Sequence, residues 1–193
     1  MNARVVLGVS GASGAALALD CARVLTGQGA EVELVLSAMA ERTLALEVGP
    51  DAIGELTGLA ARVHPVTDLG AAIASGSFPV LGMIVAPCSM RSLSAIAHGL
   101  DDTLLTRAAS VQLKERRSLI LLAREAPLTL AHLRNMTAVT EMGAIVMPPV
   151  PAFYLRPARV AQITAQIAAR AVDLLHVAPP GARAWDPKEG NAP

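Results

Sequence analysis

Polar, charged or proline-rich segments follow each of five short apolar runs in the sequence. These segments are 10–14 (SGASG), the single residue Ser37, 87–92 (PCSMRS), 124–125 (RE) and 148–154 (PPVPAFY). If the runs are strands of a parallel sheet, their carboxyl ends meet at one edge, which is where open α/β sheets bind ligands. The sequence therefore predicts one ligand site at that edge, built from hydroxyls, charges and a rigid Pro-rich loop.

The first segment has the composition of a phosphate-binding turn. Gly8, Gly11 and Gly14 follow the spacing G-x-x-G-x-x-G, which is neither the dinucleotide fingerprint G-x-G-x-x-G nor a P-loop. A plain strand-to-helix turn and an anion cradle at a helix N-terminus both fit this spacing. Ser13 could cap the helix or donate to a phosphate oxygen, and the serines after the neighbouring strands favour a phosphate.

Two cations and one carboxylate have positions that suit a binding pocket. Arg107 and Lys114 lie seven residues apart, on one face of a predicted helix, and the apolar residues between them predict a half-buried face. Buried cations need anionic partners. By contrast, Arg116 and Arg117 are expected on a solvated basic surface. Glu125 could form a surface ion pair, but its place at a strand end favours the pocket, where a carboxylate can transfer protons.

Other reactive side chains lack a recognisable pattern. The four histidines (His64, His98, His132 and His176) show no metal-ligand spacing, and two cysteines make no disulfide framework. Cys88 has no activating histidine nearby in sequence, so it is expected as a small packed residue. The segment DDTLL at 101–105 lacks the D-D-x-x-D pattern that holds magnesium for diphosphate chemistry. We expect no metal site.

The alternation of apolar runs with Ala/Leu-rich stretches predicts an α/β fold. Five strands, apolar on both faces, alternate with six helices, which is typical of a single-domain, doubly wound, Rossmann- or flavodoxin-like parallel sheet covered by helices on both faces. The predicted strands are 5–9, 32–36, 82–86, 119–122 and 144–147, and the predicted helices are 15–28, 38–46, 92–97, 104–114, 126–142 and 157–176. Residues 1–176 form the predicted domain, followed by an extended or mobile Pro/Gly/Ala-rich tail, 177–193.

Composition excludes several partners. The chain has 193 residues, with 16 basic and 16 acidic side chains, so its charge favours neither nucleic acid nor an anionic membrane. Hydrophobic residues make up 53% of the chain and the mean hydropathy is +0.48, yet no apolar run reaches the length of a membrane helix. The surplus apolar surface is expected in the core and in subunit interfaces. No signal-peptide pattern is present, which predicts a cytoplasmic protein.

The motifs together resemble one protein family. They are GVSGASGA, IASGSF, GMIVAPCSM, SLSAIAHGL, LLTRAA, LKERR, REAPL, HLRNM and MPPVPAFYLRP. In this order and spacing they are similar to the UbiX-type flavin prenyltransferases, over nearly the whole chain from Val5 to about Trp185. The related flavin-dependent cysteine decarboxylases share the fold but carry an Asn-containing signature that this sequence lacks.

The resemblance implies a transferase whose acceptor is a flavin. Members join a dimethylallyl group from dimethylallyl monophosphate to N5 and C6 of reduced FMN, without a metal. The prenylated FMN serves UbiD-type decarboxylases. The resemblance also implies a homo-oligomer, typically a dodecamer, that binds FMN between its subunits.

The resemblance assigns roles to individual residues. FMN contacts are implied for Gly11, Ala12, Ser13, Ser37, Ser89, Met90, Arg91, Ser92 and Arg124. Contacts with the donor phosphate are implied for Ser75, Arg107, Lys114, Tyr154 and Arg170. Glu125, with Lys114 and Tyr154, is implied in catalysis, Glu47 is a second acidic residue near the flavin, and Trp185 is expected to act as a lid. The chain departs from the family at Arg91, where many members have Gly, and at Ser110, which replaces a common Asp.

Two other functions stay open on the sequence alone. One is an FMN-dependent decarboxylase of the cysteine-decarboxylase group, acting on a peptide or thiol substrate. The other is a non-catalytic FMN carrier that hands flavin to a decarboxylase. The set Lys114, Glu125, Tyr154 and Arg170 favours the transferase, because storage of a flavin needs no donor-phosphate clamp.

Overall fold

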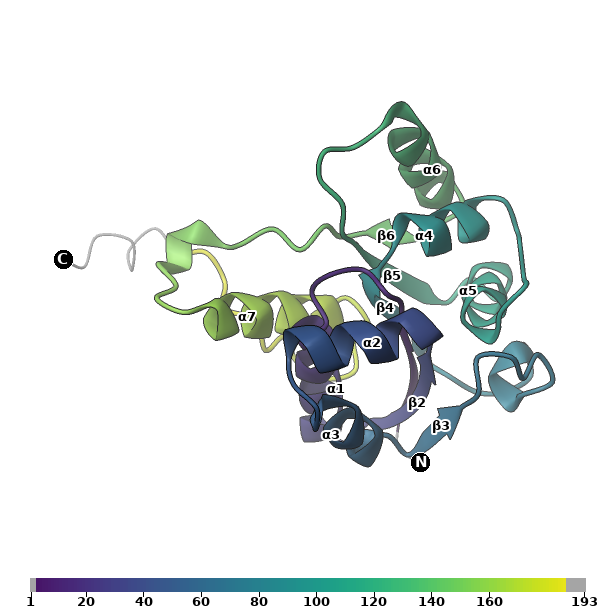
Figure 1. The fold of residues 1–193 in the computed structure, drawn as a ribbon, viewed down its shortest axis with the longest axis horizontal. Helices are drawn as coiled ribbons and strands as arrows, with labels where there is room; N and C mark the ends of the chain where they lie inside the picture. The colour runs from purple at the N-terminus through teal and green to yellow at the C-terminus, as the bar shows by residue number, and fades with distance from the viewer. Residues whose placement is uncertain (1–2, 187–193) are drawn as a thin grey trace.

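A six-stranded parallel sheet organises the chain in the computed structural model, which describes residues 3–186 (Figure 1). The strands are β1 (Arg4–Val9), β2 (Glu31–Leu36), β3 (Arg62–His64), β4 (Gly82–Cys88), β5 (Ser118–Ala123) and β6 (Ile145–Val146). Their order is β3-β2-β1-β4-β5-β6. The order therefore reverses between β1 and β4, where doubly wound sheets open a crevice at the strand ends.

Helices cover both faces of this sheet, as the alternation in the sequence predicts. They are α1 (Ala16–Gly27), α2 (Ala38–Glu47), α3 (Ala52–Leu59), α4 (Met90–Ala97), α5 (Leu104–Lys114), α6 (Leu130–Glu141) and α7 (Val160–Asp173), with short 3-10 turns η1 (Ala72–Ala74) and η2 (Phe153–Leu155). Among these described elements, the five predicted strands and six predicted helices are all found, all but α5 with shifted ends. The predicted fold class is confirmed.

The two faces of the sheet bury separate cores. Val5, Leu7 and Val9 of β1 pack with α1, α3 and α7, whereas Val6 and its neighbours in β4 pack with α4, α5 and η1. Successive strand residues point to opposite faces, so a run such as VVLGV is apolar throughout because both faces are covered. In consequence α5 and α7 lie on opposite faces of the sheet.

Two predicted helices begin clearly later than expected, and one helix and one strand were not predicted, besides the 3-10 turns η1 and η2. α6 begins at Leu130 rather than at 126, because Thr129 caps it by accepting from the backbone N–H of His132. α7 spans Val160–Asp173 rather than 157–176. The unpredicted elements are α3 and the three-residue strand β3, whose first two residues are exposed. No helix among the described residues is long and apolar enough to span a membrane.

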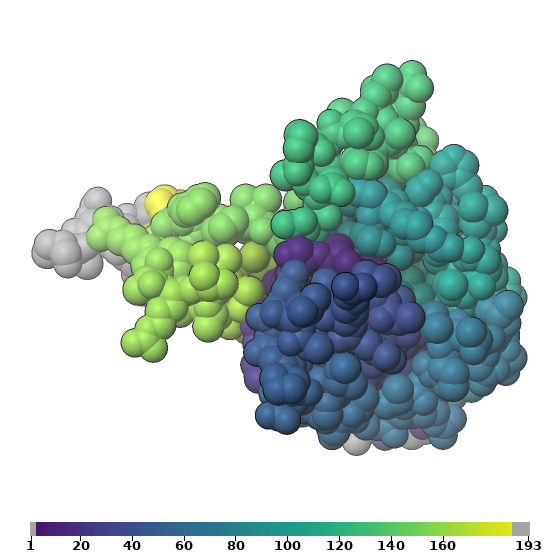
Figure 2. Space-filling view, viewed as in Figure 1, coloured from purple at the N-terminus to yellow at the C-terminus, as the bar shows by residue number. Residues whose placement is uncertain are grey.

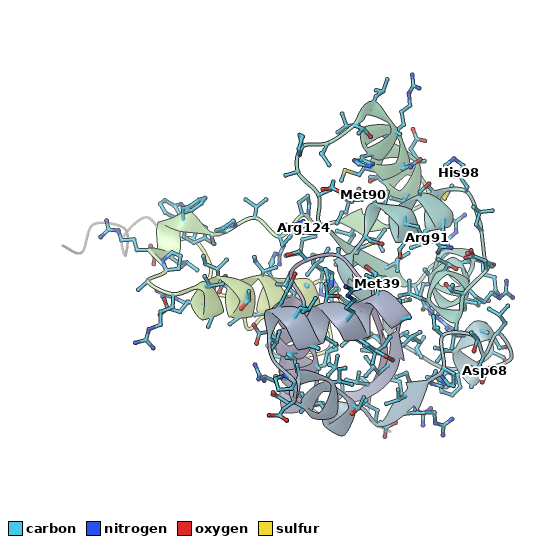
Figure 3. All side chains as sticks on the ribbon, in the orientation of Figure 1. Met39, Asp68, Met90, Arg91, His98 and Arg124 are labelled. Atoms are coloured by element: carbon cyan, nitrogen blue, oxygen red, sulfur yellow. The ribbon has the colours of Figure 1, made fainter. Side chains whose placement is uncertain are left out.

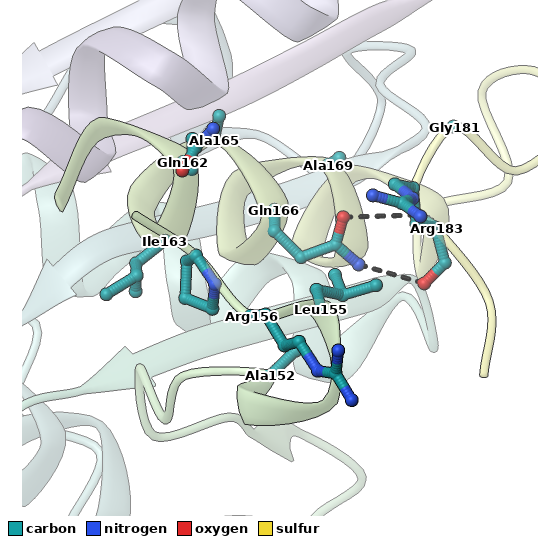
Figure 4. A pocket seen from close by; sticks show the side chains of 11 residues that line it. Ala152, Leu155, Arg156, Gln162, Ile163, Ala165, Gln166, Ala169, Gly181 and Arg183 are labelled. Carbon is teal, nitrogen blue, oxygen red and sulfur yellow. Dashed lines mark hydrogen bonds between the residues drawn. The ribbon is translucent and has the colours of Figure 1, made fainter. Parts of the chain in front are cut away.

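The C-terminal segment passes through turns and bends at 174–179 and folds back along α7. The side chain of Asp173 accepts from the backbone N–H groups of Gly181 and Ala182 at 2.7 and 3.0 Å. Gln166 exchanges two hydrogen bonds with the backbone of Arg183, seen in Figure 4 beside a cavity of about 470 Å³. Hydrogen bonds to α7 therefore hold the first part of the predicted tail as far as residue 183, and its last part, 187–193, lies outside the described residues.

Candidate functional site

A cleft of about 410 Å³ opens at the point where the strand order reverses. Residues from the loops after three strands line it, together with apolar side chains of neighbouring segments. The lining residues are Ser10, Gly11, Ser37, Ala38, Met39, Val66, Ser89, Arg91, Ser92, Thr103 and Leu105. Figure 3 shows Met39, Met90, Arg91 and Arg124 on the elements around this edge of the sheet. The cleft has the size and the mixed lining of a small-molecule site.

The buried hydroxyl of Ser10 joins the ends of β1 and β4. Its Oγ donates to the carbonyl of Pro87 and accepts from the backbone N–H of Ser89, both at 2.7 Å. Ser10 is only 2% exposed, so no water could take the place of its hydroxyl as the hydrogen-bond partner of Pro87 and Ser89. The sequence did not single out Ser10 for this bridging role.

Serine hydroxyls at the cleft cap two helices. Ser37 accepts from the backbone N–H of Ala40 at the start of α2, and Ser89 accepts from that of Ser92 at the start of α4. Their caps satisfy one backbone donor each and leave the other N–H groups of these first turns near the cleft. The predicted FMN serines therefore lie at two helix N-termini, where anions are favoured.

Glycine is required where the first loop approaches α2. A Cβ on Gly11 would lie 2.3 Å from the Cβ of Met39 and 3.0 Å from its carbonyl carbon. Gly14 has a φ of +105°, a left-handed conformation that L side chains rarely adopt. These two positions explain why the loop sequence is small and glycine-rich.

The start of α1 already holds a carboxylate of the protein itself. Glu47, the last residue of α2, accepts from the backbone N–H groups of Gly14 and Ala15 at 2.8 and 2.9 Å. Burial raises the pKa of Glu47, but hydrogen bonds from Ala15, Gly14 and the Ser13 side chain, with the charge of Arg124, lower it by more, so the pKa lies below its ordinary value. The backbone N–H groups at the start of α1 therefore do bind an anion, and that anion is the carboxylate of Glu47.

Arg124 and Glu125 follow β5 at the same edge of the sheet, as predicted. The backbone N–H of Arg124 donates to the carbonyl of Cys88, which fixes the end of β5 beside that of β4. The Arg124 side chain lies close enough to Glu47 to lower its pKa. Glu125 is exposed, and its Oε1 accepts from the backbone N–H of Ala126 at 3.0 Å. Cys88 itself is fully buried, which raises the pKa of its thiol to about 12.

The predicted donor-phosphate residues fall into two groups. The first lies around α5, where the Lys114 ammonium pairs with Glu115 at 2.6 Å. A Cβ on Gly76 would lie 2.6 Å from Lys114 Nζ, so this ammonium rests against the loop that carries Ser75. Arg107 is also on α5 and pairs with Asp101 at 3.0 Å.

The second group lies on the opposite face of the sheet, at α7 and η2. Tyr154, Arg170 and Trp185 line a cavity of about 400 Å³. The Tyr154 and Trp185 rings meet edge to face, with centroids 5.3 Å apart. Within one protomer, Tyr154, Arg170 and Trp185 share one cavity, whereas Arg107 and Lys114 lie at opposite ends of α5. The structure does not join the two groups.

Arg117 has partners that the sequence did not predict. It was expected on a solvated surface, but it is half-buried and donates to the carbonyls of Gly76 and Phe78 at 2.6 and 3.1 Å. The expectation for Arg117 was wrong, because two backbone carbonyls distant in sequence hold the guanidinium. Arg117 thereby ties the loop of Ser75 to the end of α5. The described residues contain no group of three or more His, Cys, Asp or Glu side chains arranged for a metal.

Comparisons with known proteins identify relatives over nearly the whole chain. The flavoprotein family model matches residues 1–171. A flavin prenyltransferase UbiX from Neisseria meningitidis serogroup B is 49% identical over 185 residues, covering 96% of this chain and 97% of the relative.

Two solved structures have the same fold at substantial identity. AnUbiX (PadA1) in complex with FMN and dimethylallyl pyrophosphate superposes with a TM-score of 0.92 at 40% identity, covering 96% of this chain and 98% of that one. A dodecameric FMN-dependent UbiX-like decarboxylase from Escherichia coli O157:H7 has a TM-score of 0.88 at 40% identity, covering 94% of this chain and 100% of that one.

The lowered pKa of Glu47 gives a pH-dependent prediction. A carboxyl group whose pKa is lower in the folded protein stabilises the fold above its unfolded pKa, and this contribution is lost as the pH falls through the folded pKa. Glu47→Gln should therefore lower the melting temperature at pH 7, and the difference from wild type should shrink between about pH 5 and pH 3.

The measurement is thermal unfolding of both proteins across that pH range. Glu141→Gln is the matched control, because Glu141 is also the last residue of a helix and is exposed. An equal deficit in the Glu141 variant, or a Glu47 deficit that does not change with pH, would contradict the capping role.

Proposed function

The chain belongs to the flavoprotein family, among the UbiX-type flavin prenyltransferases, and from this premise we propose how its residues divide the reaction. The protein is a transferase that joins the dimethylallyl group of dimethylallyl monophosphate to N5 and C6 of reduced FMN. The single observation that carries the proposed site is the cleft at the strand reversal, which is lined by two serine-capped helix starts and by the apolar side chains of Met39, Val66 and Leu105. The polar donors suit a phosphate, and the apolar lining suits a flavin ring.

The cleft residues hold the acceptor. The hydroxyls of Ser37, Ser89 and Ser92 and the first-turn N–H groups of α2 and α4 supply hydrogen-bond donors to an FMN phosphate. Gly11 and Ala12 let the loop backbone approach the ligand, while Met90, Arg91 and Arg124 surround it. Bound reduced FMN supplies the two nucleophilic atoms, N5 and C6. We propose that Glu47 holds Ser13 and Arg124 in place beside this cleft.

The donor site is completed by a second copy of the chain. We propose that Arg107, Lys114 and Ser75 of one protomer meet Tyr154 and Arg170 of another around the donor phosphate. Two observations support this: the two groups lie on opposite faces of one protomer's sheet, and the E. coli relative is dodecameric. Space-filling Figure 2 shows the segment that carries Tyr154 as a projection from the body of the molecule.

We propose that the cations around the donor phosphate assist its departure. When the allylic carbon–oxygen bond breaks, Lys114 and the arginines stabilise the leaving phosphate dianion by charge-assisted hydrogen bonds. Positive charge builds on the prenyl carbon at the same time, and the faces of Tyr154 and Trp185 can stabilise a cation. The bond from N5 to the prenyl carbon replaces the broken carbon–oxygen bond, and the N5 proton is released. Ring closure then joins C6 to the tertiary prenyl carbon, a proton adds to the other alkene carbon, and Glu125 accepts the proton that leaves C6.

One assay tests the function itself. The protein is incubated anaerobically with reduced FMN and dimethylallyl monophosphate, and the flavin is analysed by mass spectrometry. We expect a flavin heavier by one isoprene unit, together with released inorganic phosphate. A flavin that stays unmodified and bound supports the carrier function instead, and release of CO2 from a peptide with a C-terminal cysteine supports the decarboxylase.

We propose that the prenylated flavin passes to a UbiD-type decarboxylase in the cytoplasm. Adding the reaction mixture to such an enzyme, purified without its cofactor, should restore decarboxylation. A mixture that lacks only the prenyl donor should not.

Lys114→Ala tests the clamp. Loss of this charge-assisted contact should weaken use of the donor by about 1.5–3 kcal/mol, because no other group replaces the ammonium, while FMN stays bound. Steady-state kinetics against the donor and a flavin-binding titration measure the two effects. Arg116→Gln, which removes a neighbouring exposed cation, is the control. Loss of flavin with normal turnover after flavin is resupplied would refute the assignment.

Glu125→Gln tests the proton acceptor. The amide is the same size but cannot take a proton, so the variant should bind both ligands and make no tetracyclic flavin. Mass spectrometry and absorbance of the flavin follow the reaction. Product formation at the wild-type rate would exclude the role.

Trp185→Ala tests the lid. We propose that Trp185, which is 59% exposed in the protomer, covers the donor site of the assembled oligomer and keeps water from the prenyl cation. The variant should bind FMN normally but release more prenol for each prenylated flavin formed, measured by chromatography of both products. Leu69→Ala, which removes an apolar side chain that is 48% exposed in the loop after β3, is the control. An unchanged product ratio would leave Trp185 with a packing role only.

A further inference from the structure

Two adjacent aspartates bind two different arginines of the proposed site. Asp101 and Asp102 lie in the loop between α4 and α5. Asp101 Oδ2 accepts from Arg107 Nη1 at 3.0 Å, while its other oxygen accepts from the Ser110 hydroxyl at 2.5 Å. Asp102 accepts from Arg91 Nη2, and Thr106 Oγ1 lies 3.5 Å from its second oxygen.

The loop that carries both aspartates is held firmly. Thr103 caps α5 in a reciprocal capping box with Thr106, whose side chain is fully buried. The backbone N–H of Leu104 donates to the carbonyl of Val66 at 2.7 Å. Thr103 and Val66 also line the cleft, so the aspartates are attached directly to its wall.

These ion pairs are too exposed to serve mainly as stabilising contacts. The side chains of Asp101 and Arg107 are 27% and 40% exposed, and those of Asp102 and Arg91 are 54% and 59% exposed. Exposed pairs of this kind contribute between zero and about 1 kcal/mol to stability. Their geometric effect is larger, because a carboxylate bound at both oxygens restricts a guanidinium that would otherwise sample many rotamers.

Asp101 is the better placed of the two to orient its partner. Arg107 and Ser110 are three residues apart on one face of α5, and they engage the two oxygens of one carboxylate. Among the described residues, this contact uses only Nη1 of Arg107. The remaining N–H groups of the guanidinium stay available to a phosphate.

We propose that Asp101 and Asp102 are positioning residues with separate targets: Asp101 orients Arg107 toward the donor phosphate, and Asp102 holds Arg91 at the rim of the FMN cleft. This inference rests on the proposed function for the identity of the ligands. In the proposed reaction, the adjacent aspartates hold no metal. They position the two arginines instead. Arg91 is then kept at the cleft by a carboxylate from the next loop.

The test compares Asp101→Asn and Asp102→Asn in the full-length oligomer. Calorimetry measures dimethylallyl monophosphate binding to the FMN-loaded protein, and a separate titration measures FMN binding. Asp101→Asn should weaken donor binding by roughly threefold to fivefold, the effect of losing one exposed charge-assisted contact, and leave FMN binding unchanged. Asp102→Asn should weaken FMN binding by a similar factor and leave donor binding to the FMN-loaded protein unchanged. Asp51→Asn, an exposed aspartate whose side chain caps nothing, should change neither.

A second variant separates positioning from general loosening of the loop. Asp101→Asn combined with Ser110→Asp returns a carboxylate to the same place beside Arg107, and should restore donor binding. Tighter donor binding in Asp101→Asn would show that Asp101 competes with the phosphate, and would overturn the proposal. Parallel loss of both ligands in either single variant, or no rescue, would also overturn it. Because the readout is binding, wild-type protein that binds the donor without prenylating FMN refutes the proposed function and not this inference.

Discussion

The reversal of strand order between β1 and β4 is the constraint on which the site depends. Chains leave these neighbouring strands toward opposite faces of the sheet, so their loops diverge and open a cleft. The divergence would expose backbone groups at both strand ends, and the buried Ser10 hydroxyl satisfies two of them with one side chain. An unsatisfied buried donor or acceptor costs about 1–3 kcal/mol, so this bridge supports both the fold and the width of the cleft.

The helix starts at this edge are not equivalent. Glu47 neutralises the start of α1 with a full negative charge, whereas α2 and α4 begin with the uncharged caps Ser37 and Ser89. A phosphate brought to α1 would meet a carboxylate whose lowered pKa keeps it ionised at neutral pH. The same phosphate at α2 or α4 would meet hydroxyls and free N–H groups. Electrostatics therefore directs an anion to the two serine-capped helices, although the glycine loop lies at α1.

Sequence patterns predicted the sheet, but not the contacts that shape the site. Buried parallel strands are continuous apolar runs, and α5 was predicted with its observed ends because Thr103 and Lys114 are clear boundary residues. β3 has three residues with one buried, too short for a pattern. Arg117 bonds carbonyls 39 and 41 residues away, and Glu47 reaches an N–H group 33 residues away. Such pairings arise from the fold, and nothing local in the sequence signals them.

The separation of the proposed donor-phosphate residues gives the surplus apolar surface of the chain a place in an interface between copies. Lys114 on α5 and Arg170 on α7 lie on helices that cover opposite faces of the sheet, so one chain does not bring them together. A second copy can supply the missing half of the donor site, provided that the segment around Tyr154 exposes enough apolar surface to bind it. Val150, Phe153 and Val160 flank Tyr154 and are 66%, 73% and 74% exposed. Burial of these side chains in a neighbour would drive assembly by the hydrophobic effect, and the same contact would carry Tyr154 and Arg170 to their ligand. In this arrangement, assembly and formation of the donor site are a single event.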